Sequence, residues 1–439
     1  MKTLEVLLDP NPILREKAQR VNSFDGAKQE LIDDMIYTMR QFDGIGLAAP
    51  QVGVLEQIIV AEFESKEEEE NVFPLTVVVN PKIKTFSKEK VFMLEGCLSL
   101  PGKELYIKRP KKIDIEAQDR WGKPVRLQCS NLLARVLQHE IDHLQGVLMI
   151  DRIKAVKTVF IGNGTLGIPA LEMITDDPQF SLLSAITSNS RPAGRERELQ
   201  QTAIATAANH LGIKALLVDT LKNPASIEKI KVLNPQLIIL ADYGEIIPKE
   251  IINIPKYGIL NIHPSLLPKY RGPSPIVSAM LAGEKKIGIS IIKINEKVDA
   301  GEILAQIEMK IKSRDTAVNL KNHLSVLGAK LLAEVVPYYL ANEISPIKQN
   351  EKEAVMTEML KKNDGKLRGD EKPEKVDLMV RALYPWPGVY LETNKKKIFI
   401  TKVHLDREKL VIDRVKPESK REMAYKQYLA GNPPLTFRN

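Results

Sequence analysis

The sequence HEIDH at residues 139–143 constrains the fold of this chain more than any other segment. It lies within an apolar run that ends at Gly146, a pattern typical of a helix closed by a glycine. Residues four apart share a helix face, so His139 and His143 can direct two imidazoles at one metal ion. Glu140 would then lie beside the metal, where a general base is needed. We therefore favour a metal-binding helix over an ordinary helix that happens to carry two histidines.

A catalytic metal site needs a third protein ligand and an open position. The chain has two cysteines, and either could be considered for this role. Cys97 lies in the turn-rich sequence EGCLSLP at 95–101, whereas Cys129 follows an alternating strand pattern and is expected to pack in a core. We expect no signal peptide, hence a reducing compartment in which a disulfide between the two is not favoured. A thiolate at Cys97 could therefore complete a site with the two histidines.

A third segment, GIGLAAPQ at 44–51, follows a helical pattern at 28–42. Its small residues let the backbone approach a ligand closely, and Gln51 offers an amide donor. The segments 44–51, 95–101 and 139–146 resemble, in this order, the three motifs of the peptide deformylases. This resemblance covers about the first 150 residues.

The resemblance implies a set of metal ligands and a reaction. Cys97, His139 and His143 would bind the metal, which is ferrous iron in most members and zinc or nickel in some. Glu140 would serve as general base and then general acid while water attacks the formyl carbon of an N-formylmethionyl peptide.

Other residues of the motifs would assist this reaction. The resemblance implies that Gln51 and the backbone N–H of Leu98 hold the negative oxygen that develops on the formyl group. We expect Asp142, the second carboxylate of the helix, to face solvent or to support the metal ligands rather than to catalyse.

A second domain is predicted to begin almost without a linker. Residues 157–161 have a strand pattern and precede GNGTLG at 162–167, which matches the G-x-G-x-x-G pattern of dinucleotide-binding domains. The acidic residue that would bind a ribose hydroxyl is missing near the end of the next strand, at 184–191. An arginine there could instead meet the 2′-phosphate of NADP, so a dinucleotide site is a competing hypothesis.

Later strands indicate a different site. Residues 237–240 form a continuous apolar run, as buried parallel strands do. In the run 257–264, Asn261 and His263 share one face of a strand that stops at Pro264. Ligands in open α/β sheets bind outside the carboxyl ends of the strands, so we expect this pair to line a site.

The sequences NIHPSLLPKYRGP at 261–273 and VDAGEIL at 298–304 resemble the signatures of formyltransferases that use 10-formyltetrahydrofolate. The segments 381–388 and 415–423 resemble a further domain of the methionyl-tRNA formyltransferases in particular. Together the resemblance runs from about residue 157 to the C-terminus. It implies transfer of formyl from 10-formyltetrahydrofolate to the amine of methionyl-initiator-tRNA.

Formyl transfer to an amine passes through a tetrahedral intermediate with a negative oxygen. Asn261 could donate a hydrogen bond to that oxygen, and a charged or polarised His263 could support it. Asp299 could orient and charge His263 and help to move a proton to the leaving folate nitrogen. The resemblance also places the folate over four residues, which are Ser265, Leu266, Leu267 and Pro268.

A basic loop and a basic tail are candidates for contact with tRNA. By resemblance, the loop at 190–197 grips the tRNA acceptor end through Arg191, Arg195 and Arg197. Glu196 and Glu198 dilute its charge, which departs from the family pattern. The net charge of +8 permits contact with nucleic acid, and the tail is favoured to follow the tRNA backbone rather than only to confer solubility. Its basic residues are Lys395, Lys396, Lys397, Lys402, Arg407, Lys409, Arg414, Lys416, Lys420 and Arg421.

We therefore expect a multidomain chain. An α+β deformylase domain at 1–155 precedes an α/β, Rossmann-like formyltransferase core at 156–348. A connector at 349–375, with a helical part at 354–360, leads to a small OB-like β-barrel at 376–439 that contacts tRNA.

The predicted function is that of a bifunctional cytoplasmic translation enzyme, which removes formyl from new peptides and adds it to charged initiator tRNA. No apolar run approaches the ~20 residues of a membrane span, so no membrane partner is expected. Proximity to the ribosome is a further hypothesis. Two alternatives stay open: an active deformylase fused to a non-catalytic module that binds tRNA or folate, and a formyltransferase for another amine, such as glycinamide ribonucleotide or a nucleotide sugar.

Overall fold

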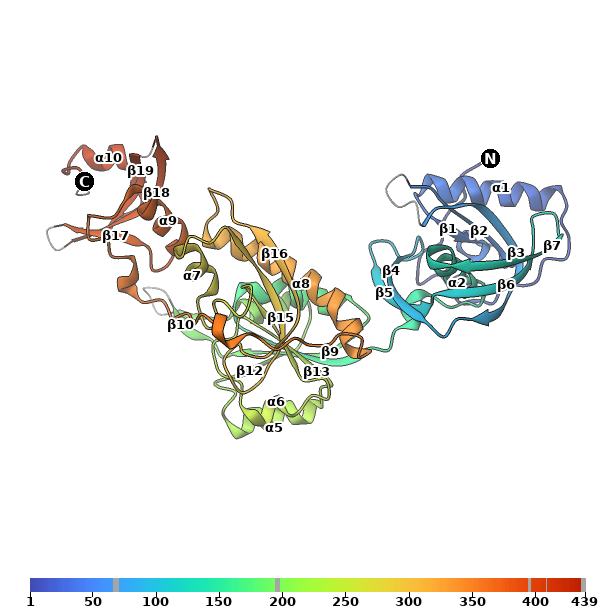
Figure 1. Cartoon of the computed structure of the whole chain (residues 1–439), viewed down its shortest axis with the longest axis horizontal. Coiled ribbons are helices and arrows are strands. Elements are labelled where there is room, and N and C mark those ends of the chain that lie inside the picture. The colour runs from blue at the N-terminus through green and yellow to red at the C-terminus, as the bar shows by residue number, and fades with distance from the viewer. Residues whose placement is uncertain (66–70, 194–197, 394–395, 408, 436–439) are drawn as a thin grey trace. The chain divides into compact units, whose positions relative to one another are not determined.

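The computed structural model describes residues 1–65, 71–193, 198–393, 396–407 and 409–435. At residues 191–193 and 198 it describes the backbone and not the side chains. It divides into two compact units (Figure 1), which are Met1–Ala155 with Asp177–Gln179, and Val156–Asp176 with Phe180–Asn439. Among the described residues, no helix has both the length and the apolar character needed to span a membrane.

The first unit has an α+β fold. Its main sheet has five antiparallel strands in the order β1-β2-β3-β6-β7, and β4 pairs with β5 in a separate hairpin that leads to Cys97. The elements are α1 Gly26–Gln41, β1 Gly46–Ala48, β2 Ile58–Phe63, β3 Phe73–Phe86, β4 Lys90–Gly96, β5 Glu104–Pro110, β6 Lys112–Gln118, β7 Pro124–Ser130 and α2 Asn131–Leu144.

Both predicted helices of this unit are present. Helix α1 begins after Asp25, whose side chain accepts a hydrogen bond from the backbone N–H of Lys28 and so caps the helix. Helix α2 holds the segment 139–143 and buries Leu137 and Leu144 in the same core as residues of the sheet. The chain turns after α2 at Gly146, which has a φ of 72°, a backbone conformation that favours glycine.

The second unit is built on a seven-stranded sheet in the order β12-β9-β8-β13-β14-β15-β16. The five strands from β12 to β14 are parallel, and β15 and β16 are added antiparallel at one edge. The strands are β8 Val156–Gly162, β9 Phe180–Ser188, β12 Ala215–Val218, β13 Leu237–Ala241, β14 Ile259–His263, β15 Lys286–Lys293 and β16 Glu302–Lys310. The strand order reverses between β8 and β13, and open α/β sheets bind ligands at such a switch point.

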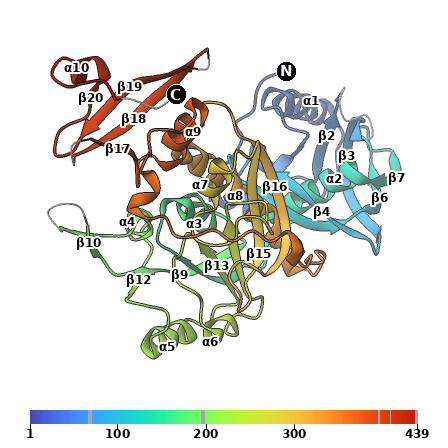
Figure 2. The same ribbon diagram turned by 60° about the vertical axis from the view of Figure 1, so that its left-hand side comes forward.

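Helices cover both faces of this sheet. Helices α5 and α6 lie together on one face (Figure 2), where Ile230 and Ile251 pack against β8 and β13. The long helix α8 lies on the other face, together with α3, α4 and α7. The helices are α3 Ile168–Asp176, α4 Ala203–His210, α5 Pro224–Leu233, α6 Lys249–Ile252, α7 Pro275–Leu281 and α8 Ala317–Leu340. The predicted Rossmann-like core is confirmed in this arrangement.

The basic loop forms a short hairpin of β10 Arg191–Ala193 and β11 Glu198–Gln200. Arg195 and Arg197 lie outside the described residues, and the side chain of Arg191 is also outside them. The predicted grip of these arginines on tRNA therefore stays a prediction.

The end of the second unit is a small domain of antiparallel strands. Its elements are α9 Pro373–Leu383, β17 Val389–Thr393, β18 Lys396–Asp406, β19 Lys409–Pro417, β20 Met423–Ala424 and α10 Tyr425–Leu429. The strands pair in the order β17-β18-β19-β20. We expected a closed barrel, but the strands in the described part of this domain pair as an open sheet.

The connector differs from its prediction. We expected a helix at 354–360, but this stretch is extended, and the nearest helical turns are η6 Glu351–Glu353 and η7 Lys362–Gly365. The helix does not form because the backbone groups bond elsewhere: Met356 pairs with Arg271 in an isolated parallel bridge.

Two candidate active sites

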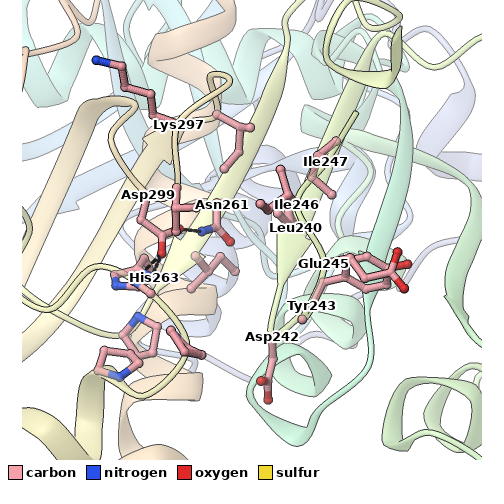
Figure 3. Close-up of a pocket in the computed structure, with 18 of the residues that line it drawn as sticks. Leu240, Asp242, Tyr243, Glu245, Ile246, Ile247, Asn261, His263, Lys297 and Asp299 are labelled. Atoms are coloured by element: carbon pink, nitrogen blue, oxygen red, sulfur yellow. Dashed lines mark hydrogen bonds and ion pairs between the residues drawn. The ribbon is translucent and has the colours of Figure 1, made fainter. Parts of the chain in front are cut away.

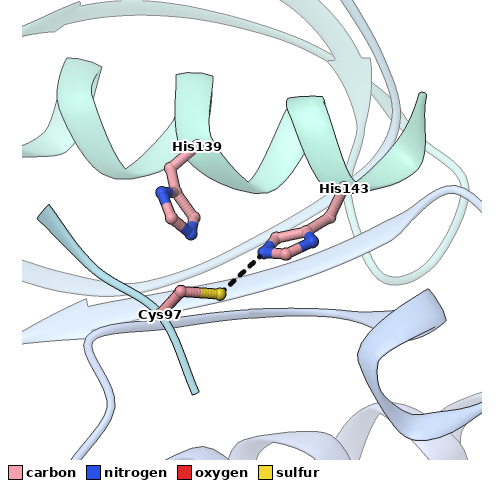
Figure 4. Close-up of side chains that lie close together, drawn as sticks. All are labelled: Cys97, His139 and His143. Carbon is pink, nitrogen blue, oxygen red and sulfur yellow. Dashed lines mark hydrogen bonds between the residues drawn. The ribbon is translucent and has the colours of Figure 1, made fainter. Parts of the chain in front are cut away.

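The predicted metal ligands lie together in the first unit. Cys97 follows β4, and His139 and His143 project from successive turns of α2 (Figure 4). One donor atom from each residue lies within 4.8 Å of the other two, and Cys97 Sγ is 3.3 Å from His143 Nε2. One thiolate and two imidazoles in this arrangement fit a tetrahedral metal site with one position left open.

A buried ion network orients the first histidine. Glu95 Oε2 lies 2.9 Å from His139 Nδ1, which leaves the other ring nitrogen of His139 for a metal. The same carboxylate accepts hydrogen bonds from Arg109 and Arg135, at 2.7 Å each. Burial by itself would raise the pKa of Glu95, but the hydrogen bonds from His139 and Arg109 lower it to about 2. Glu95 is therefore held as a carboxylate that fixes the imidazole ring.

Asp142 belongs to the same network. It accepts hydrogen bonds from Arg109, at 2.6 Å, and from Arg152, and it is 6% exposed. We expected Asp142 either to face solvent or to support the metal ligands. The first expectation is wrong, because the carboxylate is enclosed by two guanidinium groups. Asp142 supports the helix between the two histidines.

Glu140 lines a cavity next to this network. Burial raises its pKa to about 7, a value suited to both accepting and donating a proton near neutral pH. Its Oε2 has no hydrogen-bond partner within the described residues. An alanine Cβ at position 46 would lie 2.5 Å from Glu140 Oε1, so the glycine of β1 leaves room for this carboxylate. The group is buried and free to act on a bound molecule.

Gln51 faces the sulfur. Its Oε1 accepts a hydrogen bond from the Ala48 N–H at 2.8 Å, which turns its Nε2 toward Cys97 Sγ at 3.7 Å and Ser99 Oγ at 3.3 Å. Gln51 and Glu140 line a cavity of about 860 Å³, whose other walls are formed largely by apolar residues such as Leu98 and Val136. This cavity is large enough for an extended apolar substrate.

A second group of polar residues meets at the edge of the other unit's sheet. Asn261 and His263 lie at the carboxyl end of β14, and Asp299 lies in the loop between β15 and β16 (Figure 3). Asn261 Nδ2 donates to Asp299 Oδ1 at 3.4 Å, and His263 Nδ1 lies 3.6 Å from Asp299 Oδ2. The structure therefore brings all three predicted residues together.

Backbone groups fix this cluster. The Gly272 N–H donates to Asp299 Oδ2 at 2.8 Å. His263 Nε2 lies 2.9 Å from the carbonyl oxygen of Tyr270, which can only accept, so Nε2 carries a proton. The other ring nitrogen, Nδ1, faces the carboxylate of Asp299.

The two sites match known families. Residues 3–159 match the model of the family Polypeptide deformylase, residues 156–336 that of Formyl transferase, and residues 359–410 that of Formyl transferase, C-terminal domain. The methionyl-tRNA formyltransferase of Herpetosiphon aurantiacus is 36% identical over 251 residues, which are 57% of this chain and 82% of that protein. That of Bacillus thuringiensis is 33% identical over 304 aligned positions, with 64% of this chain and 96% of that protein covered. The chain belongs to the methionyl-tRNA formyltransferase family, with a peptide deformylase domain ahead of it.

Solved structures match the deformylase domain. The peptide deformylase of Thermotoga maritima is 37% identical, with 35% of this chain and 99% of that chain covered and a TM-score of 0.33. The enzyme of Synechococcus elongatus is 40% identical, with 35% and 80% covered and a TM-score of 0.33. The assignment of this domain rests on the family model. The predicted families are thereby confirmed, and the chain combines two enzymes of translation.

The formyltransferase site has walls that the sequence did not indicate. A cavity of about 360 Å³ beside Asn261, His263 and Asp299 is lined by residues 242–247, which follow β13, and by 294–298. The predicted folate segment does not line it: Ser265 and Leu267 are buried in a turn. The sequence carries one signal for this wall: residues 242–247 come just after an apolar strand, and ligands bind at the ends of such strands.

The glycine run after β8 has a packing role. A Cβ at Gly162 would lie 2.6 Å from the Ala241 carbonyl, and one at Gly164 would lie 1.9 Å from an oxygen of Asp242. These glycines let the turn lie against the end of β13. Residues 162–167 lie within the match to the Formyl transferase family model. Membership of that family, and not a dinucleotide-binding domain, therefore accounts for the glycine pattern.

Proposed function

We propose that the deformylase domain removes formyl from N-formylmethionyl peptides with Cys97, His139 and His143 as metal ligands. One donor atom from each of these residues lies within 4.8 Å of the other two, and Glu95 holds the His139 ring. Both observations support this assignment. The bound ion would supply Lewis acidity that activates water and polarises the formyl carbonyl. Thiolate and imidazole suit iron as well as zinc, and the family resemblance favours ferrous iron.

Glu140 carries the proton in this proposal. It accepts the proton of the attacking water, and its pKa of about 7 lets it pass that proton to the peptide nitrogen as the C–N bond breaks. Formate and a peptide with a free amine are released. Gln51 Nε2 and the Leu98 N–H donate to the formyl oxygen as charge develops on it. The apolar cavity beside them would hold the methionyl side chain.

We propose that the second site transfers formyl from 10-formyltetrahydrofolate to the amine of methionyl-initiator-tRNA. The amine nitrogen attacks the formyl carbon, and Asn261 and a polarised His263 stabilise the negative oxygen that forms. The amine loses a proton, the bond from carbon to the folate nitrogen breaks, and that nitrogen gains a proton. Asp299 orients His263 during this exchange, as their separation of 3.6 Å supports.

The binding of the two substrates is also proposed. The cavity lined by residues 242–247 takes the folate in preference to the turn at 265–268, in which Ser265 and Leu267 are buried. Arg191, Arg195 and Arg197 contact the tRNA acceptor end, and the lysines of the tail follow its backbone. Both reactions use carriers from translation, so we place them in the cytoplasm.

The convergence of Asn261, His263 and Asp299 beside a cavity is the observation that carries the transferase proposal. The test is transfer of labelled formyl from 10-formyltetrahydrofolate to methionyl-tRNA by a His143→Ala chain, in which deformylation cannot erase the product. Formylation that disappears when His263→Ala is added supports the proposal.

Absence of formylation while tRNA or folate still binds would instead favour a deformylase fused to a binding module. Formylation of glycinamide ribonucleotide or a nucleotide sugar in place of tRNA would favour a different amine substrate. The intact trio of polar residues favours transfer, and the similarity to methionyl-tRNA formyltransferases favours tRNA.

A further inference from the structure

The connector after α8 lies along the loop that follows β14. The Val355 N–H donates to the Pro268 carbonyl at 3.3 Å, the Arg271 N–H to the Val355 carbonyl at 2.9 Å, and the Thr357 N–H to the Arg271 carbonyl at 2.7 Å. These alternating bonds make the connector a neighbouring strand of the loop that carries Gly272. The connector therefore has a fixed register beside the formyltransferase site.

One connector side chain reaches the loop of Asp299. The amide nitrogen of Gln349 donates to the carbonyl oxygens of both Asp299 and Gly301, at 2.7 Å each. Its amide oxygen accepts from Arg271 Nε at 3.0 Å, so the amide cannot rotate without losing all three bonds. Arg271 is itself 4% exposed and is fixed by Glu351, at 2.9 and 3.0 Å.

The backbone of Asp299 needs such support. Its φ is 47°, a left-handed conformation that residues other than glycine adopt rarely. From this conformation its carboxylate reaches the Gly272 N–H and the side chains of Asn261 and His263. Gln349 bonds the main-chain carbonyl of the same residue and so holds the carboxylate in place.

We infer that Gln349 is a positioning residue of formyl transfer, which acts through Asp299 and is itself oriented by Arg271. This inference rests on the proposed role of Asp299. The transferase site is then complete only when the connector, which lies outside the sheet, is seated on it. A fall in kcat with little change in KM follows, because a shift of the carboxylate weakens the transition state more than substrate binding.

The test compares Gln349→Glu with Asn350→Asp in the full chain. Both replace an amide by a carboxylate in adjacent residues, but among the described residues the Asn350 side chain bonds within its own turn, to Glu353 and Lys352. A glutamate at 349 cannot donate to the two carbonyls. We measure tetrahydrofolate production from 10-formyltetrahydrofolate and methionyl-tRNA, a readout that later deformylation does not change. Deformylation by the same chain depends on the other unit and serves to normalise each sample for the amount of chain.

We expect Gln349→Glu to lower kcat by about tenfold or more, with the KM for folate within about twofold, and Asn350→Asp to leave both unchanged. In an Asp299→Asn chain, Gln349→Glu should cause little further loss, since both changes affect one group. Gln349→Met, which removes the donor without adding charge, should repeat the result if the glutamate chain unfolds.

Equal kcat for Gln349→Glu and Asn350→Asp would overturn the inference. So would a loss that is undiminished in the Asp299→Asn chain, because it would show a general effect on stability. If the chain without substitutions produces no tetrahydrofolate but still deformylates, the result contradicts the proposed transferase function itself rather than the role of Gln349.

Discussion

Single residues of this chain differ in reactivity because burial differs. Cys97 lies beside a large cavity, whereas Cys129 is 3% exposed within the core of the deformylase domain. The two thiols are free, as the sequence indicated. Burial, aided by the charge of Asp114, raises the pKa of the Cys129 thiol to about 11. Since the thiolate is the reactive form, only one cysteine of the folded chain is chemically accessible.

Alkylation should therefore distinguish the two cysteines. In the folded, chelator-treated chain at pH 8, we expect iodoacetamide to modify Cys97 and to leave Cys129 intact, because a thiol with a pKa of about 11 is largely protonated there. Mass spectrometry of the digested chain measures both sites. Unfolding in guanidinium chloride provides the control, in which both should react. Similar rates at both cysteines in the folded chain would contradict the prediction.

Glu95 contacts Nδ1 of His139 and so orients its ring. We expect Glu95→Gln to lower metal affinity by about 10–100-fold, because the neutral amide fixes the imidazole less well and removes the charge that Glu95 presents to Arg109 and Arg135. Competition with a metal chelator measures the change. Glu89→Gln is the matched control, since that carboxylate is 59% exposed and pairs only with Lys111 at the surface. Equal affinities in the two variants would refute the role of Glu95.

At the scale of helices and strands, the sequence predicted the elements whose signals lie within their own segment. The helix with His139 and His143 and the strand with Asn261 and His263 follow from periodicity and from end signals within each segment. The extended stretch at 354–360 could not be predicted this way, because its backbone bonds go to residues far away in sequence. The same holds for Gln349 and for the wall at 242–247, whose roles depend on which loops the sheet order brings together.

Strand β1 and helix α2 approach each other closely at Gly46, and this contact can be tested. We expect Gly46→Ala to lower deformylase kcat by about 100-fold, because its Cβ would lie 2.5 Å from Glu140 Oε1 and 2.8 Å from Val136 Cγ1 and would displace the carboxylate. Metal content, measured by atomic absorption, should stay unchanged. Gly26→Ala is the control, since a Cβ there meets nothing within 4 Å at the start of α1. A fully active Gly46→Ala chain would show that Glu140 tolerates displacement.

At the scale of the whole molecule, two units with separate cores share one chain. The deformylase domain extends beyond α2, because Arg152 Nε donates to Asp142 Oδ2 at 2.9 Å. The formyltransferase sheet begins at Val156, which is 3% exposed and pairs with Phe180 in β9. Only three residues, 153–155, separate these two anchors. The boundary between the two enzymes is therefore sharp, and each catalytic cluster lies wholly within one unit.

This organisation predicts that the two activities survive separation. We expect a chain of residues 1–155 to deformylate a formylmethionyl peptide with a kcat/KM within about twofold of the full chain, because its ligands and their supporting ions are all retained. A chain that ends at residue 150 is the control: it lacks Arg152, leaves part of the charge of Asp142 unpaired, and should lose stability and metal affinity. A large loss of rate in 1–155 that is restored when residues 156–439 are added would contradict independence. It would mean that the formyltransferase contributes to the deformylase site, and that fusion serves catalysis as well as joint expression.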